Sequence, residues 1–413
     1  MTQLQSRWRL SLAGWVGGFG FSLLADQVFT LALTFAALRS GSPASVAAVV
    51  AAVSVARVVM LLFGGAVADR VSHPRVSMTV TGIGRMILMV AMAVVLSVGH
   101  YSVPLLVIIA LVAGCLDGIF QPSATSMPTH IATGSESGQQ RVGALRTVVI
   151  RMSILIGNAV AGSVVAAGGP AGGFAVAGIL FLAGVLCLPV IRLSPIARTG
   201  GDRSTASYSP KQLFVDALDG LRTVRRARGV GSVLLMVALL NIGFAGPVTA
   251  GIPVMAAQRG WGADGAGWVL AGFGAGAAAA GFTLIARPLR RGYALVMLAG
   301  TTGMAVCLIG IGLTTSYVVT LVLAIVMGVC SGSSGSVSYA LITTNVPREQ
   351  VGRANALFEL TMEFGSPLSL AVTGAVATAG HPGLPFVAGG VLAGIGVVIA
   401  WLQRRVRQLT IQQ

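Results

Sequence analysis

Long apolar runs, separated by short polar segments, cover almost the whole chain. A helix needs about 20 mostly apolar residues to cross the hydrocarbon core of a bilayer, and twelve runs are long enough. Their even number places both termini on the same side of the membrane. The pattern therefore predicts an all-α polytopic membrane protein with twelve transmembrane helices, at 11–37, 44–67, 76–98, 102–126, 141–167, 170–192, 229–255, 264–286, 291–313, 315–340, 351–379 and 383–403.

The longest polar segment divides the spans into two sets of six. We therefore predict an N-terminal six-helix half at 1–193, a cytoplasmic linker at 194–228 and a C-terminal half at 229–413. From Pro210 the linker has the pattern of an amphipathic helix lying on the membrane surface, although a solvated linker fits too. The halves resemble each other, since Val142-Gly143 at span five recurs as Val351-Gly352 at span eleven. Such a repeat is typical of two parallel halves.

Composition and charge support the membrane interpretation. Hydrophobic residues make up 55% of the chain and charged residues 9%, whereas soluble proteins carry roughly 25% charged residues. The net charge of +16 does not indicate nucleic-acid binding, because most basic residues lie in segments on the side of the termini. This distribution follows the positive-inside rule. It predicts a multi-pass protein with both termini in the cytoplasm. The basic residues are almost all arginine, with Lys211 as the one lysine, which is typical of a GC-rich bacterial genome and leads us to expect the bacterial cytoplasmic (inner) membrane.

Enzymatic chemistry has little support in the sequence. The four cysteines all lie in apolar runs, and the four histidines lie in or beside loops. Neither group has the spacing of a metal site or a disulfide framework. A phosphate-binding loop, a dinucleotide fingerprint and a nucleophilic triad are also missing from the sequence. We expect no enzyme activity, no metal and no cofactor.

A short charged segment between spans two and three carries the most specific motif. It reads Gly65-x-x-x-Asp69-Arg70 and is followed by Arg75. This resembles the signature loop of the major facilitator superfamily, and the resemblance extends over essentially the whole chain. It implies that Asp69 docks at the N-terminus of span eleven, where a carboxylate is favoured. Ser72-His73-Pro74 departs from the usual Gly-Arg-Arg/Lys continuation. The implied conformational latch comprises Gly65, Asp69, Arg70, Arg75 and Arg353.

Within this superfamily the chain is most similar to the bacterial exporters of macrolides, multiple drugs and siderophores. The similarity lies in Leu24-Ala25-Asp26, Gln121-Pro122-Ser123 and the span-eleven segment Val351–Asn355. It implies secondary active, proton-coupled export of amphipathic small molecules by alternating access, with one chain per functional unit among membrane lipids. Span five has Gly157-Asn158 where antiporters often carry Gly-Pro, and span four lacks an arginine.

Four carboxylates within the spans are candidates for proton coupling. Charged groups at mid-membrane are costly and usually face a cavity or a partner. Asp26 in span one can exchange a proton or pair with a cationic cargo, or it can be a structural hydrogen-bond acceptor between helices or a permanent ion-pair partner. Glu359 and Glu363 share one face of span eleven, since they are four residues apart, and form either a proton site or a solvated or paired group. Asp117 favours a wet or paired structural role.

Other polar residues within the spans can act as counter-ions or contact the cargo. Arg57 and Arg151 are possible counter-ions to Asp26 and the glutamates, or sites for an anionic cargo, and Arg57 favours a structural role. Asn158 and Asn241 can bind cargo, although hydrogen bonding between helices is the commoner role. Two small-residue motifs, Gly272-x-x-x-Gly276 and Gly328-x-x-x-Gly332, favour close helix contacts.

Several functions share these features. An uptake permease or a uniporter for a small metabolite, and a dedicated siderophore or lipid exporter, would have the same spans. A membrane sensor that does not transport is the alternative from another class. Retention of Asp69 and of the carboxylates within the spans argues against the sensor.

Overall fold

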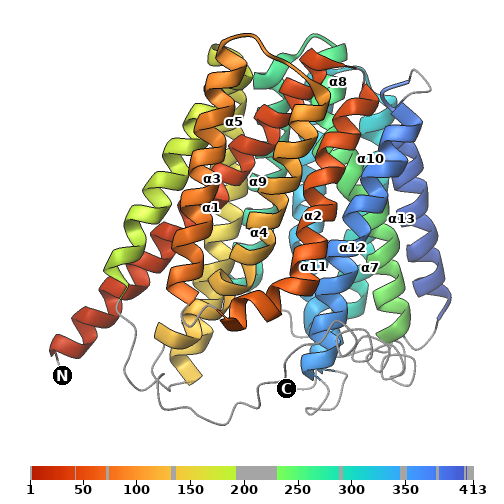
Figure 1. Ribbon diagram of the computed structural model, residues 1–413. Helices are drawn as coiled ribbons and strands as arrows, with labels where there is room; N and C mark the ends of the chain where they lie inside the picture. Colours follow the sequence, from red (N-terminus) through yellow and green to blue (C-terminus); the bar gives the residue numbers. More distant parts are fainter. Residues whose placement is uncertain are drawn as a thin grey trace.

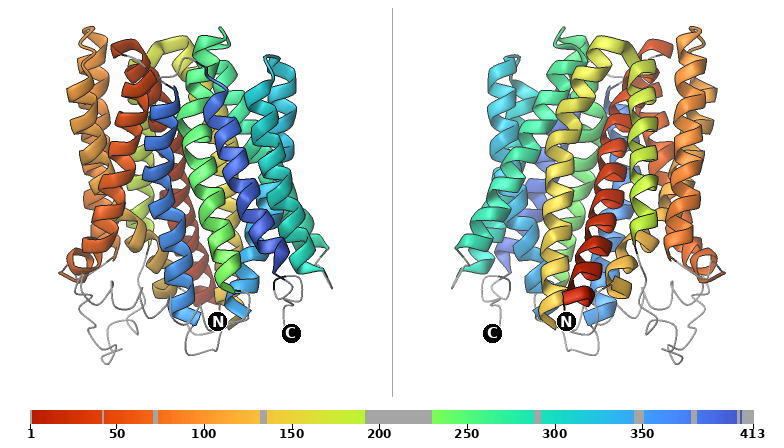
Figure 2. Two further views of the ribbon diagram at one scale, coloured as in Figure 1. Left: turned by 90° about the vertical axis from the view of Figure 1, so that its right-hand side faces the viewer. Right: turned by 90° about the vertical axis from the view of Figure 1, so that its left-hand side faces the viewer.

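The protein is a bundle of long helices whose axes are roughly aligned and whose chain passes back and forth between the two ends, as seen in the computed structural model (Figure 1). The structure describes residues 2–41, 43–70, 74–131, 136–191, 230–287, 292–344, 351–377, 381–403 and 406. The predicted linker at 194–228 lies outside these residues. Helix α1 begins and helix α13 ends at the same end of the bundle (Figures 1 and 2), as the even number of spans requires.

The helices match the predicted spans, and their ends differ by a few residues. By length and apolar composition, ten helices of the described part can cross a membrane. One of these, α5, contains two predicted spans, and α12 adds the remaining one, so the count agrees with twelve. The elements are α1 (Thr2–Ser40), α2 (Pro43–Arg70), α3 (Pro74–Ser97), α4 (Val103–Ile131), α5 (Glu136–Cys187), η1 (Leu188–Val190), α7 (Val230–Gly246), η3 (Pro247–Gly251), α8 (Ile252–Gln258), α9 (Gly262–Ala286), α10 (Tyr293–Leu313), α11 (Tyr317–Thr344), α12 (Val351–Ala377) and α13 (Leu384–Leu402).

Helix α5 reverses direction at Gly169, which separates spans five and six. This residue has φ 63° and ψ −172° and is followed by Pro170. Only glycine adopts such a conformation without strain, because it has no Cβ atom. Pro170 then begins the second helix, because the backbone N–H that proline lacks has no hydrogen-bond partner within a helix at that first position. One glycine and one proline thus make a sharp turn with almost no loop.

Replacing Gly169 by alanine is expected to destabilise the protein by about 1–3 kcal/mol, the usual cost of a residue forced into this region of φ and ψ. Gly168→Ala is the matched control, because a Cβ atom there has no neighbour within 4 Å and the backbone is not left-handed. Thermal unfolding of both variants in detergent measures the difference. Equal midpoints for the two variants would show that the turn is not strained.

Span seven is interrupted by a π-helical turn, which joins α7 to α8. The turn covers Pro247–Gly251, where proline cannot donate a backbone hydrogen bond. The Gly246 N–H donates to Ser369 Oγ of α12 at 2.6 Å, so a neighbouring helix satisfies a backbone donor at the break. Nearby, Asn241 Nδ2 donates to the Met362 carbonyl at 2.8 Å. Two side chain–backbone bonds therefore tie α7 to α12.

The two six-helix halves meet along two helix pairs, α5 with α9 and α2 with α12 (Figure 2). Glycine allows the backbones to touch: a Cβ atom on Gly162 would lie 2.8 Å from Gly267 Cα, and one on Gly374 would lie 2.5 Å from Ala47 Cβ. Ser163 Oγ also donates to Asp264 Oδ1 across the α5–α9 contact at 3.3 Å. These contacts lie toward the end of the bundle remote from the termini.

The two glycine motifs of the C-terminal half make the close helix contacts that were predicted, and the structure shows that each packs against the helix of the other. A Cβ atom on Gly276 of α9 would lie 2.1 Å from the Ile325 carbonyl oxygen of α11. One on Gly328 of α11 would lie equally close to the Phe273 carbonyl oxygen of α9. Close backbone approach of this kind is the use of small residues in membrane helices.

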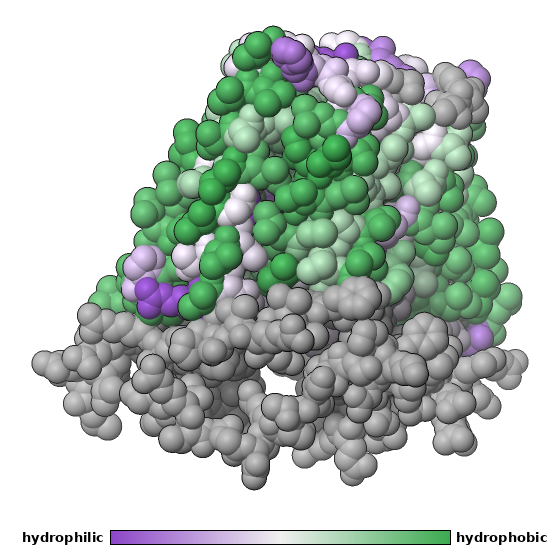
Figure 3. All heavy atoms as spheres, in the orientation of Figure 1, coloured by the Kyte–Doolittle hydropathy of each residue, from purple (hydrophilic) through white to green (hydrophobic). Residues whose placement is uncertain are grey.

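Apolar side chains cover most of the face of the bundle seen in Figure 3, and hydrophilic residues gather along its upper rim with a few more near its lower edge. Many large apolar residues are exposed there, including Val80, Val94 and Leu186. In water such a surface would favour aggregation, whereas in a bilayer it faces lipid. The surface therefore supports the multi-pass membrane interpretation.

Candidate functional site

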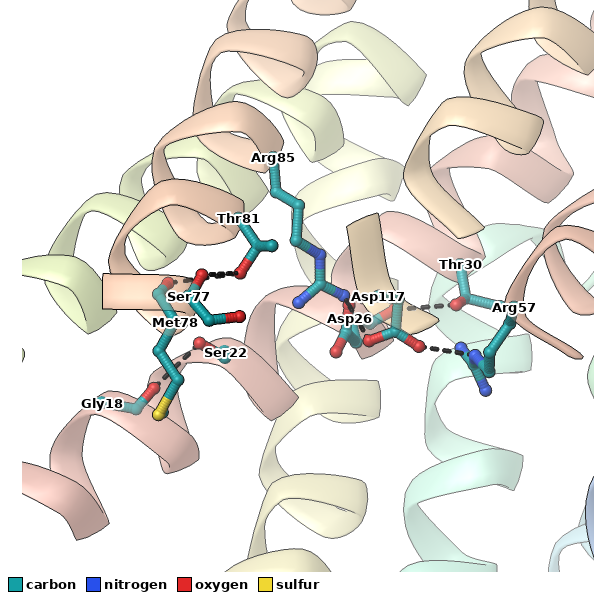
Figure 4. A network of polar contacts seen from close by, with 10 residues as sticks. All are labelled: Gly18, Ser22, Asp26, Thr30, Arg57, Ser77, Met78, Thr81, Arg85 and Asp117. Carbon is teal, nitrogen blue, oxygen red and sulfur yellow. Dashed lines mark hydrogen bonds and ion pairs between the residues drawn. The ribbon is translucent and has the colours of Figure 1, made fainter. Parts of the chain in front are cut away.

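Four charged side chains from α1, α2, α3 and α4 form a buried network in the N-terminal half (Figure 4). Asp117 lies at its centre, is 1% exposed and contacts two arginines. Arg85 Nη2 donates to Asp117 Oδ1 at 2.9 Å, and Arg57 Nε lies 2.5 Å from Asp117 Oδ2 as an ion pair. Asp117 is therefore paired with two arginines and shielded from solvent, so the paired structural role applies and the solvated one does not.

Arg85 joins Asp117 to Asp26. Its Nη2 atom also donates to Asp26 Oδ1, so one amino group connects two carboxylates. The guanidinium carbon lies 4.5 Å from the ring centroid of Phe181 and 5.3 Å from that of Phe120, which adds cation–π attraction. With Arg57, the network contains two carboxyl groups and two guanidinium groups, and its charges balance when both carboxyl groups are ionised. Neutrality is what makes four charges tolerable at this depth.

The sequence reasoning missed Arg85 as a site residue. The signal was present, because Asp26 and Asp117 require two cations nearby and only a few arginines lie within spans. Arg57, considered above as a counter-ion to Asp26, has Asp117 as its direct partner instead. Arg151 forms no ion pair with any residue in the described part, and its side chain is partly buried in α5.

A cavity of about 330 Å³ lies beside this network, mostly within the C-terminal half. Arg57 is the lining residue contributed by the N-terminal half, so it belongs to both the network and the cavity. Glu363 of α12 lines the same cavity and attracts Arg57 electrostatically. The remaining walls come from α7, η3, α10, α11 and α12, and they contain Val237, Leu240, Asn241, Phe244, Ala245, Thr249, Thr301, Met304, Ser331, Ser334, Gly335, Ser338, Phe358, Met362 and Ser366.

The two asparagines proposed as cargo ligands occupy different places. Asn241 lines the cavity, with its amide nitrogen already bonded to α12. Asn158 Nδ2 donates to Gln27 Oε1 at 3.2 Å and to the Ile154 carbonyl at 2.7 Å. Asn158 therefore links α5 to α1 and does not line the cavity.

For the predicted latch, the structure describes one side chain. Arg75 Nη1 donates to the Ile191 carbonyl at 3.1 Å, so it holds the start of α3 against the end of span six within the N-terminal half. Gly65 has no side chain, and the side chains of Asp69, Arg70, Arg353 and Glu359 lie outside the described part of the structure. In that part there is also no group of three or more metal-binding side chains.

Comparisons with known proteins agree with this architecture. The sequence matches the family model described as Major Facilitator Superfamily over residues 10–291 and 233–412. A comparison with curated protein sequences gave no match. Three similar solved structures share the fold at low identity. A D-xylose–proton symporter has a TM-score of 0.72 at 16% identity, with 98% of each chain covered.

The other two structures are transporters as well. The nucleoside transporter NupG has a TM-score of 0.66 at 15% identity, covering 95% of this chain and all of that one. The human organic anion transporter MFSD10 has a TM-score of 0.62 at 15% identity, covering 95% of this chain and 99% of that one. At these identities the likeness concerns the fold alone.

Proposed function

The chain belongs to the Major Facilitator Superfamily, and we propose that it exports an amphipathic small molecule from the bacterial cytoplasm in exchange for protons. Membership makes it a multi-pass membrane transporter and not an enzyme. The proposal rests chiefly on one observation, that Arg57 connects the buried charge network to the cavity. The cavity lies mostly within the C-terminal half and reaches the N-terminal half through Arg57, and alternating access requires a substrate site that both halves contact.

Asp26 is our leading proton-exchanging group. Its side chain is 16% exposed, whereas that of Asp117 is 2% exposed, so a proton reaches Asp26 more easily. Protonation of Asp26 would remove one of the two anions that hold Arg85 and leave Asp117 with both arginines. Protonation or deprotonation of Asp26 would thus change how strongly Asp117 is shared between Arg85 and Arg57, and Arg57 lies on the cavity wall. Glu363 is the second candidate, followed by Glu359 and Asp117.

Export is proposed because of the resemblance to the macrolide, multidrug and siderophore exporters. We further propose that the protein works as a monomer in the inner membrane, with both termini cytoplasmic. Uptake of a small metabolite is the alternative function. The many hydroxyl groups on the cavity wall favour that alternative, because they suit a polar solute.

Accumulation of ethidium and rhodamine B in cells stripped of their own pumps tests the proposal. Cells making the wild-type protein should retain less of at least one dye, and a protonophore should abolish the difference. Asp26→Asn should abolish it too, at equal protein levels in the membrane. Asp264→Asn, at an exposed aspartate near the bundle end, is the control and should export normally.

The same measurement separates the alternatives. Higher dye content in cells with the wild-type protein would indicate uptake. A difference that a protonophore leaves unchanged would indicate a uniporter. Export that survives Asp26→Asn but fails in Glu363→Gln would move the proton site to α12.

A further inference from the structure

The cavity wall carries opposite charges from opposite halves of the protein. Among its described lining residues one is basic, Arg57 of α2, and one is acidic, Glu363 of α12. They attract each other electrostatically. A ligand with a single charge would be attracted by one of these residues and repelled by the other. A ligand with both charges would be attracted by both.

Arg57 has binding capacity left for an anion. Its Nε atom faces Asp117, and its two amino groups have no hydrogen-bond partner in the described part of the chain. The side chain is 33% exposed, because it reaches the cavity. Guanidinium stays charged at all physiological pH values and binds carboxylates in a fixed geometry. Arg57 can therefore hold a carboxylate while it keeps Asp117.

Several of the hydroxyl groups that line the cavity form no hydrogen bond within the described part of the protein. In the described residues, Ser331, Ser338, Ser366 and Thr249 form no hydrogen bond, unlike Thr301, which donates to the Met297 carbonyl at 2.9 Å. A hydroxyl that loses contact with water on ligand binding and gains no hydrogen-bond partner weakens that binding. A purely apolar ligand would leave these groups unpaired, whereas a ligand with polar groups would satisfy several of them.

Apolar side chains complete the wall. Phe244 and Phe358 offer ring surface, and Met304 and Met362 offer thioether groups that pack well against aromatic rings. The volume of about 330 Å³ lies at the lower end of the range of small-ligand sites. The cavity thus suits a small molecule with one apolar or aromatic portion.

We propose that the cavity binds small zwitterions with an aromatic or apolar portion, amino acid-like molecules whose carboxylate binds Arg57 and whose ammonium group binds Glu363. This inference rests on the proposed function for the role of the cavity as the transport site, and it names the substrate class. Such a ligand connects α2 of one half to α12 of the other. It therefore binds most tightly in the conformation in which the two halves place these residues at the separation of its two charges. A ligand that binds one conformation more tightly than another shifts the conformational equilibrium, as a transported substrate must.

Binding of three compounds with one skeleton tests the proposal: L-tyrosine, tyramine, which lacks the carboxylate, and 3-(4-hydroxyphenyl)propionate, which lacks the ammonium group. Isothermal titration calorimetry is performed on the purified full-length protein in lipid nanodiscs. We expect L-tyrosine to bind at least about tenfold more tightly than either analogue, since each lacks one charge-assisted hydrogen bond.

Two variants test which residue of the protein binds which charged group of the ligand. Glu363→Gln should weaken binding of L-tyrosine and tyramine about tenfold or more and leave the propionate unchanged or tighter. Arg57→Lys should weaken the binding of L-tyrosine and the propionate and leave the binding of tyramine unchanged. Unlike Arg57→Gln, it retains a cation beside Asp117 and is therefore the safer variant for folding. Ser97→Ala, at an exposed serine that donates only to the Val94 carbonyl of its own helix α3, is the control and should bind all three compounds normally.

Three results would overturn the proposal: tyramine binding as tightly as L-tyrosine, no heat of binding with any compound, or an equal loss for all three compounds in Glu363→Gln. Calorimetry needs no proton gradient. Binding of L-tyrosine can therefore be observed even if no dye is exported, and dye export can be observed even if L-tyrosine does not bind. The two proposals are thus tested by independent results.

Discussion

Replacing Asp117 by alanine is expected to destabilise the protein by about 3–5 kcal/mol, the usual cost of removing one partner from a buried ion pair. The reason is that Asp117 holds both Arg57 and Arg85. Arg85 is 3% exposed and would keep Asp26 as its remaining carboxylate. Arg57 would lose its direct ion-pair partner at membrane depth.

The effect is measured as the apparent free energy of unfolding in a titration with a denaturing detergent. Asp264→Ala is the matched control, since this aspartate is exposed at the start of α9 and accepts one exposed hydrogen bond, from Ser163, so its variant should lose far less stability than Asp117→Ala. A stable Asp117→Ala variant would show that water or rearranged side chains replace the carboxylate, and that the network is not essential for folding.

Replacing Gly276 by alanine is expected to cost about 1–3 kcal/mol, as overpacking of a close contact usually does. The added Cβ atom would lie 2.1 Å from the Ile325 carbonyl oxygen. This oxygen belongs to the backbone of α11 and cannot turn aside as a side chain would. Helices α9 and α11 would have to separate, and the contacts along their whole crossing would loosen.

Gly281 on the same helix provides the control. A Cβ atom there has no neighbour within 4 Å, and alanine favours the helix over glycine by about 1 kcal/mol. Gly281→Ala should thus be neutral or slightly stabilising in thermal unfolding followed by gel filtration. Equal losses in both variants would mean that helix flexibility, and not the crossing, explains the glycines.

The candidate site was predicted in part. Asp26, Asp117 and Arg57 were recognised from the cost of a charge within a span, and the structure joins all three in one network. Glu363 and Asn241 do line the cavity. Arg85 was overlooked although it binds both aspartates, and Asn158 links two helices of the N-terminal half.

The α11 hydroxyls were also overlooked, and the reason is physical. Ser331, Ser334 and Ser338 lie on one face of α11, at spacings of three and four residues. In a membrane helix a serine can donate to its own backbone, as Ser333 does to the Val329 carbonyl at 2.9 Å. Spacing alone does not distinguish serines that face a cavity from serines bonded within their own helix.

The spans, their grouping into two sets of six and the presence of close helix contacts at the glycine motifs could be predicted from the sequence. These features depend on the transfer of each residue from water to lipid and on local glycine spacing, and both are properties of a short stretch of chain. The tertiary structure alone decided which arginine binds which aspartate and that Arg57 reaches the cavity. Those contacts depend on how each helix is rotated about its axis, and this rotation is set by the packing of all its neighbours at once.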